Sequence, residues 1–453
     1  MKIWLASKWD ELRANFWFVP SVMVSGAVAL SLATIRLDKA TASRNWIATL
    51  GWTFTRGPEG SRAVLSTVAG SMMTITSITF SITIVALQLA SSQFGPRLLR
   101  NFMRDRGNQV ALGTFIATFA YCLLILRTIN GTDTELFVPH ISVTVGLLMA
   151  LFSLGVLIFF IHHAAESIQA ENVIAAVSRD LRQAIDRLYP DGQGDDARES
   201  SAGGQQALPA DFERSSRPIA APSSDYLQAI DVDGLVNLAN DRDLIISVVN
   251  RPGEFIFEGS DLVRIWPGDR VDDDLNNAVL GAFYFGRQRT LAQDVGFAID
   301  QLVEVAVRAL SPGVNDPFTA INCVDRLGAA LCVLGAKEMP PDFRLDDDGR
   351  LRVVTDSSTA SGIINASFHQ IRQAARGDAA VTIRLLEAIA AIAGRTRDPD
   401  FLAALRRHAD MIHRGSLEGL PEKSDREDAD DRYRRALDAL DASGLSREVG
   451  DQV

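Results

Sequence analysis

Hydrophobic residues are distributed unevenly along the chain, and nearly all of the long apolar runs lie before residue 165. A helix rises ~1.5 Å per residue, so about 20 apolar residues are enough to cross a hydrocarbon core of ~30 Å. Four stretches reach this length, namely Phe16–Ile35, Val64–Ala90, Val110–Ile129 and Ile141–Ile161. The pattern predicts four transmembrane helices and a four-helix transmembrane domain over residues 1–165.

The second stretch, Val64–Ala90, is uncharged but rich in hydroxyl groups. At about 100° per residue, one side of this helix carries small and polar residues: Thr67, Gly70, Ser71, Thr74, Ser77, Ser81 and Gln88. We call this set the hydroxyl stripe. A thinner set, Thr76, Thr79 and Thr83, lies on roughly the opposite side. Two polar sides favour a helix that is buried in an assembly, because lipid tails offer hydroxyl groups no hydrogen bonds.

Three interpretations of the hydroxyl stripe remain open. It can be a packing face, since small residues such as Ser66 and Gly70 let helix backbones approach closely. It can line a permeation pathway. Its hydroxyls can also simply bond to carbonyl groups one turn earlier, as Ser and Thr do readily in membrane helices.

The chain changes character after the apolar stretches. Ala164–Leu188 has apolar residues at helical spacing, which predicts a helix that continues out of the membrane. Tyr189–Ser224 collects Gly, Pro, Ser and charged residues, a composition typical of a flexible linker. We therefore assign residues 166–224 to a helix extension and a linker.

Asp225–Gly268 contains short β-branched and aromatic segments such as LIISVVN and EFIFEG, which predict strands separated by turns. The spacing of Gly253 and Gly259 resembles that of lipoyl-like barrel-sandwich modules. No lysine stands at a hairpin tip there, which argues against a lipoylated or biotinylated carrier. Residues 225–270 are expected to form a small β module.

Residues 271–453 are predicted to be mainly helical. The expected helices are Asp274–Leu310 (one long or two shorter), Phe318–Gly335, Ser361–Ala375, Ala379–Ala393, Asp400–His413 and Asp428–Leu440. Before the second of these, Asp316 can cap the helix and Pro317 suits its first position. Phe343–Val354 is expected to form a hairpin that turns at Asp347-Asp348-Gly349.

Three sequence segments carry a resemblance to a known family. They are IDVDGLVNLA, RPGEFIFEG and, most specifically, ALSPGVNDPFTA at Ala309–Ala320. Together with four spans and a Ser/Thr-rich second span, they resemble a bacterial family of predicted integral membrane proteins known only as a domain of unknown function. The resemblance implies a membrane location and brings no established activity.

Candidate chemistry is sparse. Ser311, Asn315 and Asp316 can hold an ion or phosphate at a helix start, or they can form a structural corner. His162 and His163 diverge by ~100° on a helix, so we expect interfacial anchors rather than a metal site. The three cysteines form no CxxC pair, and the acidic turn at Asp346–Gly349 lacks the spaced ligands of a calcium loop. Without a P-loop, HExxH, GxSxG or kinase signature, we expect neither an enzyme nor a cofactor.

Charge adds constraints on partners and orientation. The net charge of −11 is concentrated after residue 165, which argues against nucleic acid as a partner. The loop Arg97–Arg106 holds four arginines, whereas Asn130–His140 holds no basic residue before its terminal histidine. The positive-inside rule therefore predicts that the first of these loops and both termini are cytoplasmic, although the basic loop Arg36–Arg62 counts against this orientation.

The predicted fold is an α-helical membrane protein with four transmembrane helices and a cytosolic α+β region. That region would combine a small barrel-sandwich-like β module with a helical C-terminal part. The first functional hypothesis is a homo-oligomeric ion channel or permeation pathway of the bacterial inner membrane, coupled to a cytosolic regulatory domain. The second is a non-conducting membrane sensor or scaffold whose cytosolic domain binds an unidentified partner or ligand.

Overall fold

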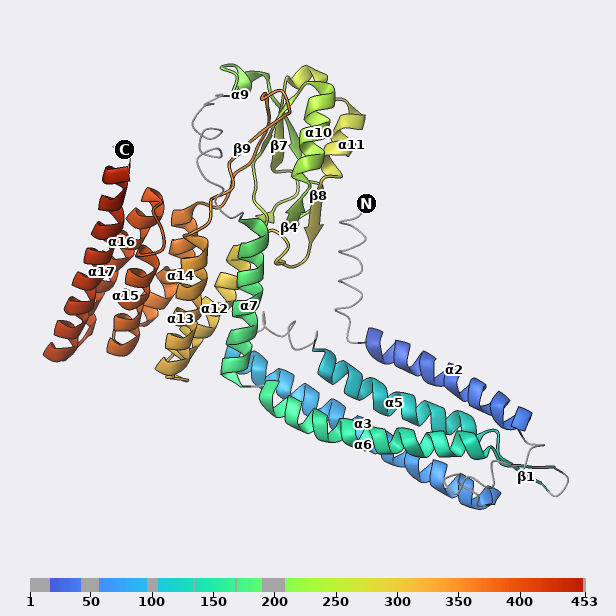
Figure 1. The fold of residues 1–453 in the computed structure, drawn as a ribbon. Helices are drawn as coiled ribbons and strands as arrows, with labels where there is room; N and C mark the ends of the chain where they lie inside the picture. Colours follow the sequence, from blue (N-terminus) through green and yellow to red (C-terminus); the bar gives the residue numbers. More distant parts are fainter. Residues whose placement is uncertain are drawn as a thin grey trace. The chain divides into compact units, whose positions relative to one another are not determined.

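The computed structural model describes residues 17–41, 57–95, 105–132, 135–167, 169–189 and 208–450. The chain divides into two compact units, Met1–Asn172 and Val173–Val453. Each unit has its own hydrophobic core, and Figure 1 shows the helices and strands of both units. The predicted linker residues 190–207 and most of the loop Arg97–Arg106 lie outside the described residues.

The first unit is built from long helices. They are α2 (Phe18–Thr41), α3 (Pro58–Phe94), α5 (Arg106–Leu126) and α6 (His140–Ser167), with a short hairpin of β1 (Asn130–Thr132) and β2 (Glu135–Phe137). Each predicted apolar stretch lies largely in one of these helices. Helix α5 packs against α2, α3 and α6 and is the most buried of the four. The remaining helices therefore surround α5 and leave their outer faces open (Figure 1).

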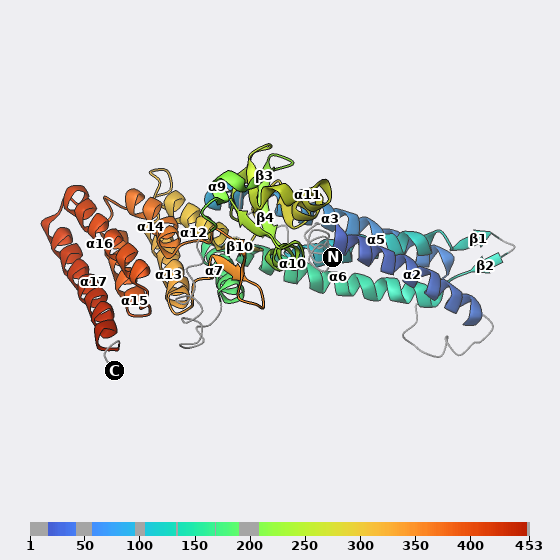
Figure 2. The same ribbon diagram turned by 90° about the horizontal axis from the view of Figure 1, so that it is seen from above.

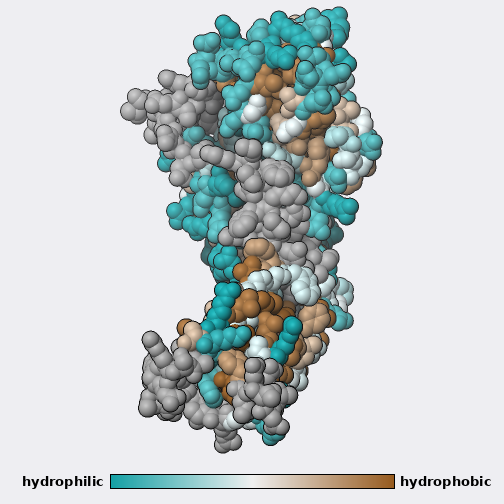
Figure 3. Space-filling model, turned by 90° about the vertical axis from the view of Figure 1, so that its right-hand side faces the viewer, coloured by the Kyte–Doolittle hydropathy of each residue, from teal (hydrophilic) through white to brown (hydrophobic). Residues whose placement is uncertain are grey.

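Much of the surface on those outer faces is apolar, which is the pattern expected where lipid replaces water. On α6, Leu151, Phe152 and Ile158 leave 60%, 67% and 66% of their surface exposed. Figure 3 shows hydrophobic side chains of this unit at the molecular surface. A water-soluble helix of this length would carry polar residues on that face. The first unit therefore has the surface of a membrane-embedded bundle.

The number of apolar helices differs from the prediction. Five helices in the described residues are long and apolar enough to cross a membrane, namely α2, α3, α5, α6 and α13 (Pro317–Leu334). The additional one belongs to the second unit, where it packs against α12 (Val295–Ala309) and α15 (Ala379–Ala393). Its Asp325 pairs there with Arg384 of α15. Length and hydropathy alone do not separate a core helix of this kind from a span.

The second unit begins with α7 (Ala170–Leu188) and contains two sheets. Its strands are β3 (Arg217–Ala220), β4 (Asp225–Ile230), β5 (Ile245–Val248), β6 (Phe255–Ile256), β7 (Asp261–Trp266), β8 (Phe283–Gly286), β9 (Phe343–Leu345) and β10 (Leu351–Val354). One sheet has the order β3-β7-β5-β10-β9, with β10 parallel to β5 and the other neighbours antiparallel. The other sheet has the order β6-β4-β8 and is antiparallel.

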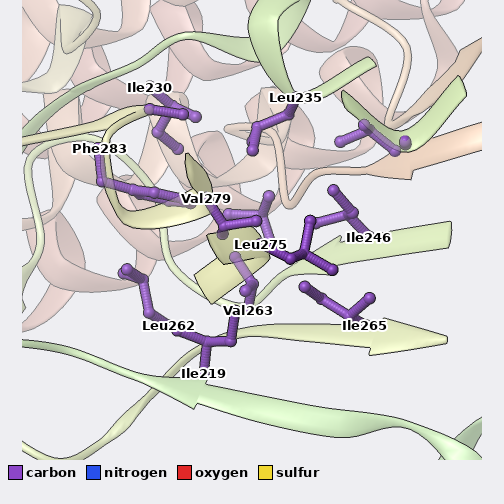
Figure 4. Packing of buried hydrophobic residues seen from close by; sticks show 14 of the residues in the cluster. Ile219, Ile230, Leu235, Ile246, Leu262, Val263, Ile265, Leu275, Val279 and Phe283 are labelled. Atoms are coloured by element: carbon purple, nitrogen blue, oxygen red, sulfur yellow. The ribbon is translucent and has the colours of Figure 1, made fainter. Parts of the chain in front are cut away.

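The core of this region lies between the strands and the helices α10 (Val232–Arg242) and α11 (Asp273–Leu280). Figure 4 shows Leu235 and Leu275 from these helices facing Ile246 and Val263 from the larger sheet. The region is α+β: residues 225–270 contain strands as predicted for a small barrel-sandwich-like β module, but these strands belong to two sheets, and the prediction missed helix α10 within the range. The reason lies in IDVDGLVNLAN, whose apolar residues recur at helical spacing and whose Asp231 caps α10 by accepting from Gly234 N–H at 3.1 Å.

Two further boundaries differ from the prediction. The predicted linker ends too late, because α9 (Phe212–Ser215) and β3 are ordered elements that bury Phe212 and Ile219. The predicted helical stretch Asp274–Leu310 forms two shorter helices, α11 and α12, which was one of the two alternatives, but it also contains the unpredicted strand β8, an aromatic Phe-Tyr-Phe-Gly segment that follows a turn at Gly281. The short helix η3 (Gly268–Arg270) links β7 to the segment before α11.

The rest of the unit is a helical array, as predicted. Helices α14 (Ala360–Ala374), α15, α16 (Pro399–Gly419) and α17 (Lys423–Gly450) follow the hairpin β9–β10, which forms as expected from its sequence. Helix α14 packs against α12 and α16, and α17 packs against α15 and α16. Figures 1 and 2 both show these helices side by side. The predicted bounds of α15 match the observed helix residue for residue.

Candidate functional site

The hydroxyl stripe lies on the outer face of α3. All seven of its residues are exposed, whereas Leu65, Ala69 and Met72 of the same helix are buried against the bundle. An added Cβ at Gly70 would meet nothing within 4 Å. Within its own unit, the stripe is therefore not a packing face.

Four of the stripe hydroxyls are bonded to their own helix. Thr67 donates to the Ala63 carbonyl at 2.8 Å and Thr74 to the Gly70 carbonyl at 3.1 Å, while Ser77 and Ser81 bond one turn back at 3.0 and 2.9 Å. This is the local bonding that membrane helices permit. Gln88 differs, because its exposed carboxamide has no hydrogen-bond partner among the described residues. The thinner set turns inward, where Thr79 and Thr83 are buried.

A polar cluster that the sequence analysis missed lies inside the bundle at the end of α2. The carboxylate of Asp38 is 6% exposed and accepts from the N–H groups of Ile141 and Ser142 at 2.9 and 3.0 Å. It also accepts from the Ser142 hydroxyl at 2.6 Å. Tyr121 of α5 donates to the Ser142 carbonyl at 3.0 Å and shares a hydrogen bond with the Thr34 hydroxyl at 3.0 Å.

This cluster ties three helices together at the amino end of α6. The free N–H groups there carry partial positive charge, so a carboxylate from α2 is stabilised in this position. The sequence analysis ended the first span at Ile35 and treated Asp38 as a loop residue. The signal that would have included it is the helical pattern that continues to Thr41. Ionisable groups inside a membrane bundle are costly unless partnered, and here the carboxylate accepts three hydrogen bonds from Ile141 and Ser142.

The opposite end of the bundle holds an acid–histidine pair. Asp105 caps α5 by accepting from Gly107 N–H at 2.8 Å, and its other oxygen lies 2.6 Å from Nε2 of His163 on α6. An added Cβ at Gly107 would lie 2.5 Å from that Nε2 atom, so a side chain here would displace the His163 ring. His162 points elsewhere and pairs with Glu166 at 3.2 Å. The two histidines therefore do not share a site, as their helical spacing predicts.

The segment Ser311–Pro317 forms a closed corner between α12 and α13. Asn315 adopts φ of 49°, and its N–H donates to the Ser311 carbonyl at 2.9 Å. Asp316 accepts from Thr319 N–H at 3.2 Å and from the Thr319 hydroxyl at 2.6 Å, as its predicted capping role requires. The Ser311 hydroxyl donates to the Arg308 backbone carbonyl at 2.7 Å. Of the two interpretations, these contacts support the structural corner, because the Ser311 hydroxyl and the Asp316 carboxylate are bonded to the ends of α12 and α13.

The described residues contain no group of three or more His, Cys, Asp or Glu side chains that could hold a metal ion. The three cysteines are free. What the first unit presents instead is a largely apolar exterior, a hydroxyl stripe on α3 and polar clusters at both ends of the bundle. These features define an integral membrane protein with a large additional α+β unit.

The comparisons agree with that class and name the family. A family described as predicted membrane protein (DUF2254) matches residues 13–391, and the chain belongs to it. The chain is 33% identical over 428 residues to uncharacterized proteins of Mycobacterium bovis and Mycobacterium tuberculosis, a match that covers 92% of this chain and 79% of each relative. No solved structure matches.

Proposed function

We propose that the protein forms a homo-oligomeric permeation pathway in the bacterial inner membrane, with α2, α3, α5 and α6 as its four spans and the second unit as a cytosolic regulatory part. The observation that carries the proposal is the outward direction of the hydroxyl stripe on α3. A stripe turned away from its own bundle meets lipid, a second copy of the chain or water.

Lipid is the least favourable of these neighbours. Bonding to the helix's own carbonyls lowers the cost of exposing Thr67, Thr74 and Ser81 to lipid, but Gln88 has no such option. Where Gln88 lies within the hydrocarbon core, an amide group with no partner costs several kcal/mol, roughly 4–8 on a scale where nothing can hydrogen-bond. A polar neighbour from another copy, or water, removes that cost.

A pathway within one copy has no room. Phe115 and Tyr121 of the central helix α5 are fully buried among the surrounding helices. Ions would therefore cross between copies, around a symmetry axis lined by α3. At ~1.5 Å per residue, the 37 residues of α3 extend over roughly 55 Å, more than a hydrocarbon core of ~30 Å.

The alternative is a non-conducting sensor or scaffold. The back-bonded hydroxyls favour it, because groups that are already satisfied need no water and allow two α3 helices to pack directly. In that case, α3 would be the contact between copies, and the second unit would bind a partner or ligand.

Cysteine scanning separates the two functions. In a background without Cys122, Cys323 and Cys332, single cysteines replace Thr67, Thr74 and Ser81, and a control cysteine replaces Phe152 on the apolar face of α6. A pathway predicts reaction of the three stripe cysteines with a water-soluble thiol reagent and loss of conductance in reconstituted bilayers. Cross-linking between copies without reaction supports the scaffold. A protein that is monomeric in nanodiscs and does not conduct removes the permeation proposal.

A further inference from the structure

An arginine-lined cleft lies in the helical part of the second unit. Its walls come from α14, α15 and α16, and its volume is about 420 Å³. Three arginines line it: Arg372 from α14, Arg376 from the turn after α14, and Arg414 from α16. The only acid in the lining is Glu418.

The single carboxylate of Glu418 does not neutralise the three arginines of the cleft. Glu418 pairs with Arg376. Arg414 forms no ion pair or hydrogen bond with the described side chains, and the buried Nε of Arg372 has no acceptor there. Within the described part of the chain, the Arg372 guanidinium has one hydrogen-bond contact, between its Nη2 and Nδ1 of His369 at 3.3 Å. Two guanidinium groups in one cleft are therefore left without an anion.

The surroundings of Arg372 disfavour a positive charge that has no anion beside it. Burial lowers the pKa of Arg372, and the nearby charge of Arg414 lowers it further. Burial is the main cause that lowers the pKa values of neighbouring His369 and His408, and a histidine ring in either protonation state supplies no negative charge. A fold that gathered these groups for stability alone would place a carboxylate beside Arg372, because an unpaired buried donor destabilises the folded state.

The frame of the cleft is rigid. The Thr382 hydroxyl of α15 donates to the Ala375 carbonyl at 3.1 Å, which fixes the turn that carries Arg376. At Gly419, the end of α16 approaches this turn so closely that an added Cβ would lie 2.2 Å from the Arg376 carbonyl oxygen. The guanidinium groups therefore project from fixed backbone positions, an arrangement that favours binding because little order is lost when a ligand enters.

We propose that this cleft binds a small phosphate-bearing anion. Guanidinium forks match phosphate oxygens in geometry, and two uncompensated charges match the roughly −1.5 to −2 of a phosphate monoester at pH 7. The cavity volume is that of a site for a small molecule rather than for a polymer. The phosphate can come from a soluble metabolite or from a lipid headgroup, which share this chemistry.

Binding is measured on the full chain in nanodiscs of phosphatidylcholine, by calorimetry with inorganic pyrophosphate as the probe. The variants Arg372→Gln and Arg414→Gln each remove one guanidinium from the cleft. Arg397→Gln is the matched control, since Arg397 is exposed, lies outside the cleft and carries the same charge. The expected result is saturable binding that weakens with salt, by about tenfold or more in each cleft variant, and stays unchanged in the control.

Two outcomes overturn the proposal. One is that pyrophosphate shows no saturable binding, and the other is that the cleft and control variants lose the same binding affinity, which would mean non-specific charge attraction.

A second experiment adds phosphatidylinositol phosphate to the nanodiscs and repeats the pyrophosphate titration. Competition by the lipid assigns the site to a headgroup, and its absence assigns the site to a soluble phosphate. Thermal unfolding of Arg372→Gln checks folding, with an unchanged or higher midpoint expected. None of these readouts depends on conductance, so failure here leaves the proposed permeation function untouched.

Discussion

The carboxylate of Asp38 in α2 caps the amino end of α6, with its Oδ2 atom 2.6 Å from the hydroxyl and 3.0 Å from the backbone nitrogen of Ser142. These residues are 104 positions apart in the chain. A cap normally comes from the residue just before the helix, and here it comes from a different helix. The contact therefore fixes α2 and α6 relative to each other as well as satisfying the start of α6.

Replacing Asp38 with Ala should destabilise the first unit. The change leaves the N–H groups of Ile141 and Ser142 without a partner in the bundle, at a cost of about 1–3 kcal/mol for each unsatisfied group. Ser142→Ala is the matched control, because it removes the hydroxyl contact and keeps both backbone contacts. Thermal unfolding in mild detergent should rank wild type above Ser142→Ala and Ser142→Ala above Asp38→Ala. Equal midpoints for the two variants would contradict the capping role.

Two glycines of the second unit allow the cost of backbone strain to be measured separately from the cost of a steric clash. Gly253 and Gly259 both have positive φ, at 99° and 83°. An added Cβ at Gly253 would lie 2.3 Å from Oδ2 of Asp294, whereas at Gly259 it meets nothing within 4 Å. Asp294 cannot move away easily, because Arg289 holds both of its oxygens at 2.8 and 3.1 Å.

Gly259→Ala should therefore cost only the backbone strain, about 1 kcal/mol, while Gly253→Ala should cost at least about 2 kcal/mol more. Denaturant unfolding of the full chain, followed by a probe in the second unit, measures the difference. If both variants lose the same stability, the close approach of Gly253 to Asp294 has no energetic weight.

Local signals in the sequence predict much of this fold, and non-local contacts account for the rest. The apolar stretches, the cap at Asp316 and the bounds of α15 all follow from patterns within about twenty residues of sequence. The larger sheet does not, because β10 pairs with β5 across roughly a hundred residues and no local pattern specifies that register. The candidate site residues also divide into those with a local sequence signal and those that depend on non-local contacts. The hydroxyl stripe is visible as a helical period, whereas the arginine cleft needs α14 and α16 to be brought together.

Orientation can be tested with reporter fusions. A fusion after residue 108 lies just beyond the arginine-rich loop Arg97–Arg106, and one after residue 138 lies beyond the hairpin β1–β2. The positive-inside rule predicts cytoplasmic reporter activity at 108 and periplasmic activity at 138. A fusion at the C-terminus should match the one at 108. The reverse pattern would place the second unit outside the cytoplasm and remove the regulatory role proposed for it.

We expect His408 to make the second unit sensitive to acid. Its ring is fully buried, Nε2 lies 2.9 Å from Oδ1 of Asn365, and Nδ1 has no partner in the described part of the chain. Burial lowers its pKa to about 3, with smaller contributions from nearby His369, Arg372 and Arg407. The folded protein therefore holds this ring neutral at pH values where the unfolded chain, with an ordinary pKa near 6.5, binds a proton.

This difference in the His408 pKa between the folded and unfolded states determines how stability changes with pH. Above about pH 6.5 the neutral ring makes its full contribution to the free energy of unfolding. This contribution is lost as the pH falls from there toward 3, because the unfolded state takes up the proton. One proton sets an upper limit of about 1.4 kcal/mol per pH unit. We expect the unfolding midpoint of wild type to fall more steeply between pH 6.5 and 4.5 than that of His408→Gln, which keeps a side-chain amide for Asn365. Parallel curves for the two proteins across this range would show that His408 carries a proton in the folded state or does not titrate on unfolding.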